Sequence, residues 1–249
     1  MPSISETGHA KNVANFMQLV SFVQDYGADY KPTRDSIKLP NLKTKAKAAE
    51  TAVAAVNAAL VSYDNAIADR EAAFSQLPKL GTRMVNALKA TEATSQIIAS
   101  MVSFNKKLQG TRVSAVLTDE ELKAKQAARG KAVKQVSASQ QSFDNRLDTF
   151  DKMVKLLESI PYYDPNETEL KAATLTVLYN TLKANNATVA SATTLLSNAR
   201  VKRNLTMYDP ENGLPATAQD VKSYVKSVYG ASNPAYKQIA SLAIRDIPL

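Results

Sequence analysis

A heptad pattern of apolar residues runs along the first third of the chain. Between positions 42 and 67 these residues alternate steps of four and three, at Leu42, Ala46, Ala49, Val53, Val56, Leu60, Tyr63 and Ile67. Such spacing keeps one stripe of a helix against a partner helix. Arg70 interrupts the stripe before Phe74 and Leu77 resume it. The pattern predicts one long helix that ends near Pro78, because proline cannot continue a helix.

A second stripe predicts another long helix in the middle of the chain. It runs through Val133, Val136, Gln140, Phe143, Leu147, Phe150, Val154 and Leu157. The capping box Thr118-Asp119-Glu120-Glu121 places its start at Thr118, and Pro161 places its end. Further helices are predicted over residues 82–108, before Gly27, before Gly230 and from Pro234. We therefore expect an all-α, elongated, mostly antiparallel bundle, with residues 1–249 as a single domain.

The chain repeats itself at an offset of 133 residues. Tyr30-x-Pro32 matches Tyr163-x-Pro165, and further matches at the same offset pair Leu42 with Leu175, Val56 with Val189, and Arg70 with Arg203. These matches favour a duplicated three-helix unit. Pseudo-repeat 1 would cover about residues 8–110, a connector about 111–139, and pseudo-repeat 2 about 140–245. The alternative interpretation is that any two heptad helices align at some offset.

Composition narrows the possible chemistry. The chain has no Cys, one His and 7 Gly, and none of the glycines forms a phosphate-binding motif. A disulfide scaffold, a thiol nucleophile, a Cys-ligated metal and a multi-histidine site within one chain are thereby excluded. His9 follows Gly8 at a predicted helix start, where we expect it to be exposed. We predict that the chain is not an enzyme and uses no cofactor, metal or small-molecule substrate.

The net charge of +8 is unevenly placed. Basic residues concentrate around positions 102–139 and include Lys106, Lys107, Arg112, Lys123, Lys125 and Arg129. The stretch 140–171 is acidic, and Asp144, Asp148 and Asp151 share one helix flank. A basic face can bind nucleic acid or an anionic membrane, whereas opposed faces can drive head-to-tail assembly. The third interpretation is a solvated helix surface.

Two further sets of residues are candidates for interaction. Arg70 and Arg203 occupy equivalent stripe positions, where a buried arginine must be paired. The alternative, which we favour, is that both mark a helix end emerging into solvent. Tyr163 and Tyr208 belong to similar tyrosine-containing turns. Tyrosine suits packing at a bundle end, and it also suits an assembly contact.

Three segments carry a family resemblance: residues Ser5–Phe16, Ser142–Leu147 and Asp220–Val228. They resemble a family of bacterial all-helical proteins, and the resemblance extends over nearly the whole chain. It implies a helical fold and no particular activity or catalytic residue. In outline, long helices in a chain of this size are also similar to α-helical pore-forming toxins. Such toxins need an insertable apolar segment, and this sequence has no clear one.

These observations predict a non-enzymatic structural or scaffolding protein. We expect it to form a homo-oligomer, or to bind a protein partner, through helical faces of opposite charge. A membrane-active, pore-forming-like protein that acts at a membrane surface is the first alternative, and a polyanion binder that takes nucleic acid is the second. No signal segment and no apolar stretch of spanning length is seen, so a cytoplasmic location is predicted.

Overall fold

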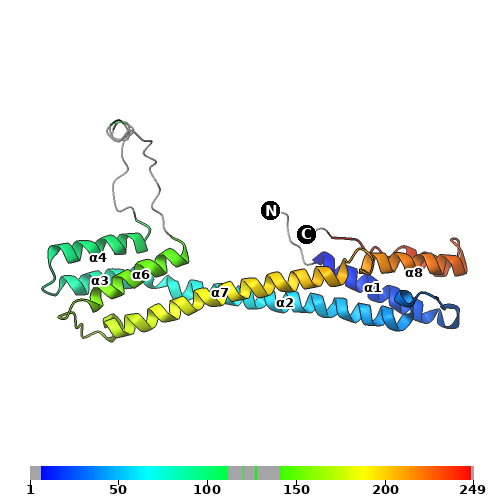
Figure 1. The fold of residues 1–249 in the computed structure, drawn as a ribbon, viewed down its shortest axis with the longest axis horizontal. Coiled ribbons are helices and arrows are strands. Elements are labelled where there is room, and N and C mark those ends of the chain that lie inside the picture. The colour runs from blue at the N-terminus through cyan, green and yellow to red at the C-terminus, as the bar shows by residue number, and fades with distance from the viewer. Residues whose placement is uncertain (1–6, 112–119, 121–126, 128–140, 248–249) are drawn as a thin grey trace. The chain divides into compact units, whose positions relative to one another are not determined.

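The computed structural model describes residues 7–111, 120, 127 and 141–247 (Figure 1). Its regular elements there are all helical, which confirms the predicted all-α class. The α-helices are α1 (Thr7–Asp25), α2 (Leu39–Ser75), α3 (Leu77–Lys89), α4 (Ser95–Leu108), α6 (Phe143–Glu158), α7 (Ala172–Met207), α8 (Leu214–Tyr229) and α9 (Pro234–Ala240). Short 3₁₀ turns are η1 (Gly27–Asp29), η2 (Asp35–Ile37) and η3 (Thr168–Leu170). No helix among the described residues has the length and apolar character needed to cross a membrane.

The chain divides into two compact units that share the two longest helices. Unit 1 comprises residues 1–64 and 191–249, and unit 2 comprises residues 65–190. The divisions fall inside α2 and α7, so each of these helices supplies one part to each unit. The units therefore cut across the repeat boundaries that the sequence predicts.

Unit 1 is built around the apolar faces of α1 and α8. Their fully buried side chains include Phe16, Leu19, Leu214, Val221 and Val225. The first part of α2 adds the predicted stripe, because Leu42, Ala46, Ala49, Val53 and Val56 are all buried. Small alanines in this stripe allow the backbones of neighbouring helices to approach closely.

Unit 2 is built around α3, α4 and α6, which pack against one another (Figure 1). Phe74, Met84, Met101, Phe150 and Met153 are all 0% exposed in its core. Each of these side chains adds roughly 1.5–3 kcal/mol relative to an exposed one. Each unit therefore has its own hydrophobic core.

Several of the predicted helix boundaries can be compared with the structure. The long helix ends at Ser75, and α3 begins at Leu77 with Pro78 in its first turn, as the proline predicts. The helix predicted over 82–108 is wrong as one element, because α3 ends at Lys89 and the Thr94 side chain caps a new helix by accepting from the Ile97 N–H.

The helix predicted from Thr118 also needs correction. It does not run continuously to Leu157, because the Ser142 side chain accepts from the Asn145 N–H and starts α6 at Phe143. Such a cap satisfies a backbone donor that an interior position would already have paired. Residues 112–119, 121–126 and 128–140, which include Thr118 and most of the upstream stripe, lie outside the described residues.

Candidate functional site

Each unit contains a tyrosine–proline turn that leads into one of the two longest helices, and a tyrosine hydroxyl closes both of these turns in the same way. In unit 1 the Tyr30 hydroxyl donates to the Ile37 carbonyl at 2.7 Å, and in unit 2 the Tyr163 hydroxyl donates to the Leu170 carbonyl at 3.0 Å. Each bond spans seven residues and leads through a 3₁₀ turn into a long helix. Both rings are buried, and burial raises the pKa of the Tyr30 phenol and raises that of Tyr163 to about 12. The hydrogen bond from the buried Tyr163 hydroxyl to the Leu170 carbonyl therefore stabilises the turn that contains it.

The two turns carry opposite charges at matching positions. Residues 30–38 have three basic side chains and one acidic one, whereas residues 163–171 have three acidic side chains and one basic one. At the offset of 133, Lys31 matches Asp164 and Arg34 matches Glu167. All four of these residues are exposed. The reversal places positive charge at the turn of unit 1 and negative charge at the turn of unit 2.

The ion pair between each turn and its neighbouring helix is reversed as well. Arg34 of the first turn pairs with Asp220 of α8 at 2.6 Å. In unit 2, Arg83 of α3 pairs with Glu169 of the second turn at 2.7 Å. Arg34, Arg83 and Glu169 are exposed and Asp220 is half-buried, so each pair contributes at most about 1 kcal/mol. Each pair neutralises one charge of its turn, so that net positive charge remains around the first turn and net negative charge around the second.

A cavity lies beside the second turn. Its volume is about 690 Å³, and it is lined by Ala87, Tyr162, Tyr163, Asp164, Glu167 and their neighbours on α3 and the turn. In unit 1, the ring of Tyr224 packs edge-on against Tyr30, with 5.1 Å between centroids. The Tyr224 hydroxyl also accepts a hydrogen bond from the Lys31 N–H at 3.0 Å. In unit 1, aromatic side chains thus fill the position that corresponds to the open cavity of unit 2.

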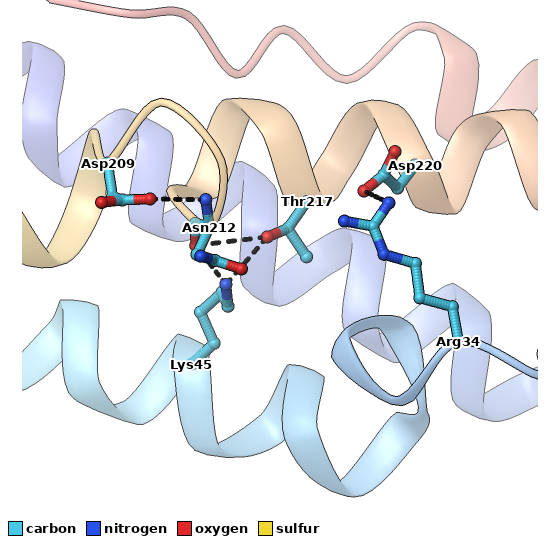
Figure 2. Close-up of polar contacts among 6 residues, drawn as sticks. All are labelled: Arg34, Lys45, Asp209, Asn212, Thr217 and Asp220. Carbon is cyan, nitrogen blue, oxygen red and sulfur yellow. Dashed lines mark hydrogen bonds and ion pairs between the residues drawn. The ribbon is translucent and has the colours of Figure 1, made fainter.

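A second difference between the units is a partly buried lysine, shown in Figure 2. From α2, the Lys45 ammonium donates to the Asn212 carbonyl and to the Thr217 hydroxyl of α8, the latter at 2.9 Å. The Asp209 carboxylate holds the intervening loop by accepting from the Asn212 N–H at 2.7 Å. Burial lowers the pKa of Lys45. This cluster is satisfied within unit 1, which makes it a structural element of the unit.

The two arginines singled out from the sequence have different surroundings. Arg203 is 2% exposed, and its guanidinium donates twice to the Asn204 side-chain oxygen, at 2.9 and 2.8 Å. The prediction that it emerges into solvent is wrong, because the stripe position is covered in unit 1. Arg70 is half-buried, with its guanidinium 4.0 Å from the centroid of the Phe143 ring. Stacking on an aromatic face stabilises a cation there.

The prediction that His9 is exposed is also wrong. His9 is 4% exposed, and its Nδ1 lies 2.7 Å from the hydroxyl of Tyr208. Asn12 donates to the same hydroxyl at 3.1 Å and to the Arg245 carbonyl at 2.7 Å, and it accepts from the Arg245 N–H at 3.1 Å. Tyr208, which the sequence predicts to take part in interactions, thus makes hydrogen bonds to His9 and Asn12 within unit 1. The network ties α1 to the C-terminal segment.

The predicted acidic flank of α6 is internally paired. Asp148 pairs with Lys152 at 2.5 Å, and Asp151 with Lys155 at 2.6 Å. The Asp144 carboxylate accepts from the Asn186 side chain at 3.0 Å. Within the described part of the chain, no group of three or more His, Asp or Glu residues is arranged to hold a metal ion.

Only part of the predicted basic stretch can be placed. Lys106 is exposed and Lys107 is half-buried in the last turn of α4. Arg112, Lys123, Lys125 and Arg129 lie outside the described residues. The charge contrast that the structure describes is therefore carried by the two turns.

Sequence reasoning missed several residues of this site, namely Lys45, Arg83, Ala87, Glu169, Thr217, Asp220 and Tyr224. A signal for them is present at a second offset. Leu77-Pro78 and Leu214-Pro215 both open a helix and lie 137 residues apart, and buried Met84 and Leu88 match buried Val221 and Val225 at that offset. At an offset of 137 residues instead of 133, the residues of α3 align with those of α8.

Comparison with known proteins adds no relative. No protein-family model, no curated protein and no solved structure matches the chain. The resemblance of three segments to a bacterial helical family therefore stays a prediction.

Proposed function

We propose that the chain is a non-enzymatic structural or scaffolding protein that associates with itself through its oppositely charged turns. The observation that carries this proposal is the reversal of charge at matching, exposed positions: Lys31 and Arg34 in unit 1, and Asp164 and Glu167 in unit 2. A contact between unlike patches is heterologous, so it builds open chains or rings of copies. Complementary charges raise the rate of encounter and fix the register of such a contact.

We further propose that the two pseudo-repeats, each of which contributes helices to both units, arose by duplication, because this explains why unlike charges occupy matching places. The equivalent hydrogen bonds of Tyr30 and Tyr163, and the equivalent buried positions of α3 and α8, support this reading. A duplicated turn begins with identical surfaces, which repel each other when charged. Reversing the charge of one copy converts repulsion into attraction.

The test is the mass of the protein as a function of salt. We expect sedimentation velocity to show oligomers at about 20 mM salt that dissociate toward monomer at about 500 mM, because the Debye length falls steeply over that range. A single species of monomer mass at every concentration and salt would refute self-association.

Charge-reversal variants locate the contact. Lys31→Glu and Glu167→Lys should each weaken association, because each places like charges opposite one another. The double variant Lys31→Glu/Glu167→Lys restores complementarity and should recover much of the loss. Lys183→Glu, which changes charge by the same amount at an exposed position of α7 outside both turn segments, is the matched control and should have little effect.

A further inference from the structure

The cavity of unit 2 has a filled counterpart whose contents indicate what it would bind. In unit 1 the filling group is the ring of Tyr224, on α8. At the offset of 137 that aligns the two helices, the matching residue of α3 is Ala87, which lines the cavity beside Tyr163. Replacing a tyrosine by an alanine removes a whole phenol ring. The open space therefore has the position of a missing aromatic side chain.

The polar groups around this space suit a phenol. In unit 1 the Tyr224 hydroxyl accepts from the backbone N–H of Lys31. The matching backbone donor in unit 2 is the N–H of Asp164, for which the described residues provide no acceptor. The Tyr163 ring, equivalent to Tyr30, lies in the same cavity wall. An incoming phenol can thus make the ring contact and the hydrogen bond that Tyr224 makes.

The rim of the cavity adds a preference for positive charge. Glu92, Asp164 and Glu167 contribute to its lining. Arg83, the basic residue of the lining, is already paired with Glu169 at 2.7 Å, and Lys171 approaches Asp164 only to 3.9 Å. Glu92 and Glu167 have no ion pair among the described residues, so a cationic group beside the phenol would meet their carboxylates.

We propose that this cavity binds a tyrosine side chain flanked by lysine, presented by a second copy of the chain. This inference rests on the proposed self-association and names its contact. Unit 1 presents such a residue: Tyr236 of α9 is partly exposed, Lys237 follows it, and the Lys226 ammonium lies 5.9 Å from its ring centroid. Unit 1 of one copy would thus supply the group that the cavity beside the acidic turn of the next copy accepts.

The first arm of the test uses tyramine, a phenol that carries an ammonium group. Binding to the isotope-labelled full chain is followed by NMR, and the amides of Asp164 and Ala87 should shift in a saturable way at millimolar tyramine. 4-Hydroxyphenylacetate, which has the same phenol with a negative charge, and phenethylamine, which lacks the hydroxyl, should both bind more weakly. Equal binding of all three, or no saturable shift with tyramine, would overturn the proposed chemistry.

Two variants connect the shifts to the cavity. Ala87→Tyr places in unit 2 the side chain that unit 1 already has, so it should abolish tyramine binding while the chain stays folded. Glu167→Gln leaves the cavity open and removes one exposed charge, so it should weaken binding by about twofold to fivefold. Undiminished binding to Ala87→Tyr would show that tyramine binds elsewhere and refute the site.

The second arm asks whether a second copy is the occupant. Sedimentation at low salt should show less association for Ala87→Tyr and for Tyr236→Phe, which lacks the hydroxyl, whereas Tyr63→Phe should associate like the wild type. If both variants associate as the wild type does, this inference fails while salt-sensitive self-association still stands. If the wild type is monomeric at every salt, the proposed function fails, and so does a second copy as the occupant.

Discussion

Lys45 and Thr217 offer a sharp test of how unit 1 is stabilised. Their counterparts in unit 2 are Leu178, at the offset of 133, and Leu80, at the offset of 137, and these two leucines lie together beside Arg83. Unit 2 thus has an apolar pair where unit 1 has a charged hydrogen bond. If the units share one architecture, the pair in unit 1 should tolerate joint replacement by apolar residues better than it tolerates either single change.

The variants Lys45→Met and Thr217→Val keep the shapes of the side chains and remove their polar atoms. Lys45→Met leaves the Thr217 hydroxyl, in a residue that is 2% exposed, with a longer 3.4 Å contact to the Asn212 carbonyl. Thr217→Val leaves a desolvated ammonium with one acceptor fewer. An unsatisfied buried polar group costs about 1–3 kcal/mol, so each single variant should lower the free energy of unfolding by about 1–2 kcal/mol.

The double variant decides between interpretations. Replacing both partners by apolar groups of similar shape is close to neutral. The double variant should therefore be no less stable than the less stable of the two single variants. The coupling free energy from urea unfolding would then be about 1–2 kcal/mol. Coupling below about 0.5 kcal/mol, the value for independent sites, would refute the claim that the two side chains act as a pair. Lys47→Met, on an exposed part of the same helix, should change stability by less than about 0.5 kcal/mol.

Three further predictions concern other parts of the two units. Tyr163→Phe leaves the Leu170 carbonyl without its donor and should lower the free energy of unfolding by about 1–2 kcal/mol, whereas Tyr162→Phe, at an exposed ring, should not. The folded-state pKa of Tyr163, about 12, lies above the ordinary value of 10.0. The contribution of its hydroxyl to stability is therefore complete below pH 10 and is lost as the pH rises toward 12. Over that range the urea midpoint should fall less for Tyr163→Phe than for the wild type. Asn12→Ala removes the bonds to Arg245 and should speed amide hydrogen exchange of residues 243–247, and unchanged exchange would show that other contacts hold this segment. Arg70→Met should cost about 0.5–1 kcal/mol through lost stacking on Phe143, with Lys183→Met, at an exposed position of α7, as a control.

The sequence predicts the helices and the turns well because both depend on local patterns. The stripe from Leu42 to Val56 is buried as its heptad spacing requires, and the match of Tyr30 and Tyr163 corresponds to two equivalent hydrogen bonds. The break at Ala90 was missed because no glycine or proline marks the turn between α3 and α4. The burial of His9 was missed because its partner Tyr208 lies 199 residues away in the sequence. A single polar residue in a helical pattern gives no indication of such a partner.

The Lys45 cluster has a physical origin that the sequence alone conceals. One residue separates α2 from α3, whereas residues 208–213 separate α7 from α8, and this longer loop changes the offset from 133 to 137. The loop is tight: an added Cβ at Gly213 would lie 2.5 Å from the Asp209 carbonyl oxygen. It also supplies the Asn212 carbonyl that Lys45 binds, an acceptor with no equivalent between α2 and α3. Lysine is therefore favourable at position 45 because of the loop, and Leu178 suffices in unit 2, where the direct connection leaves no acceptor to satisfy. Shortening the loop should thus make Lys45 destabilising relative to methionine, which reverses the order expected for the natural chain.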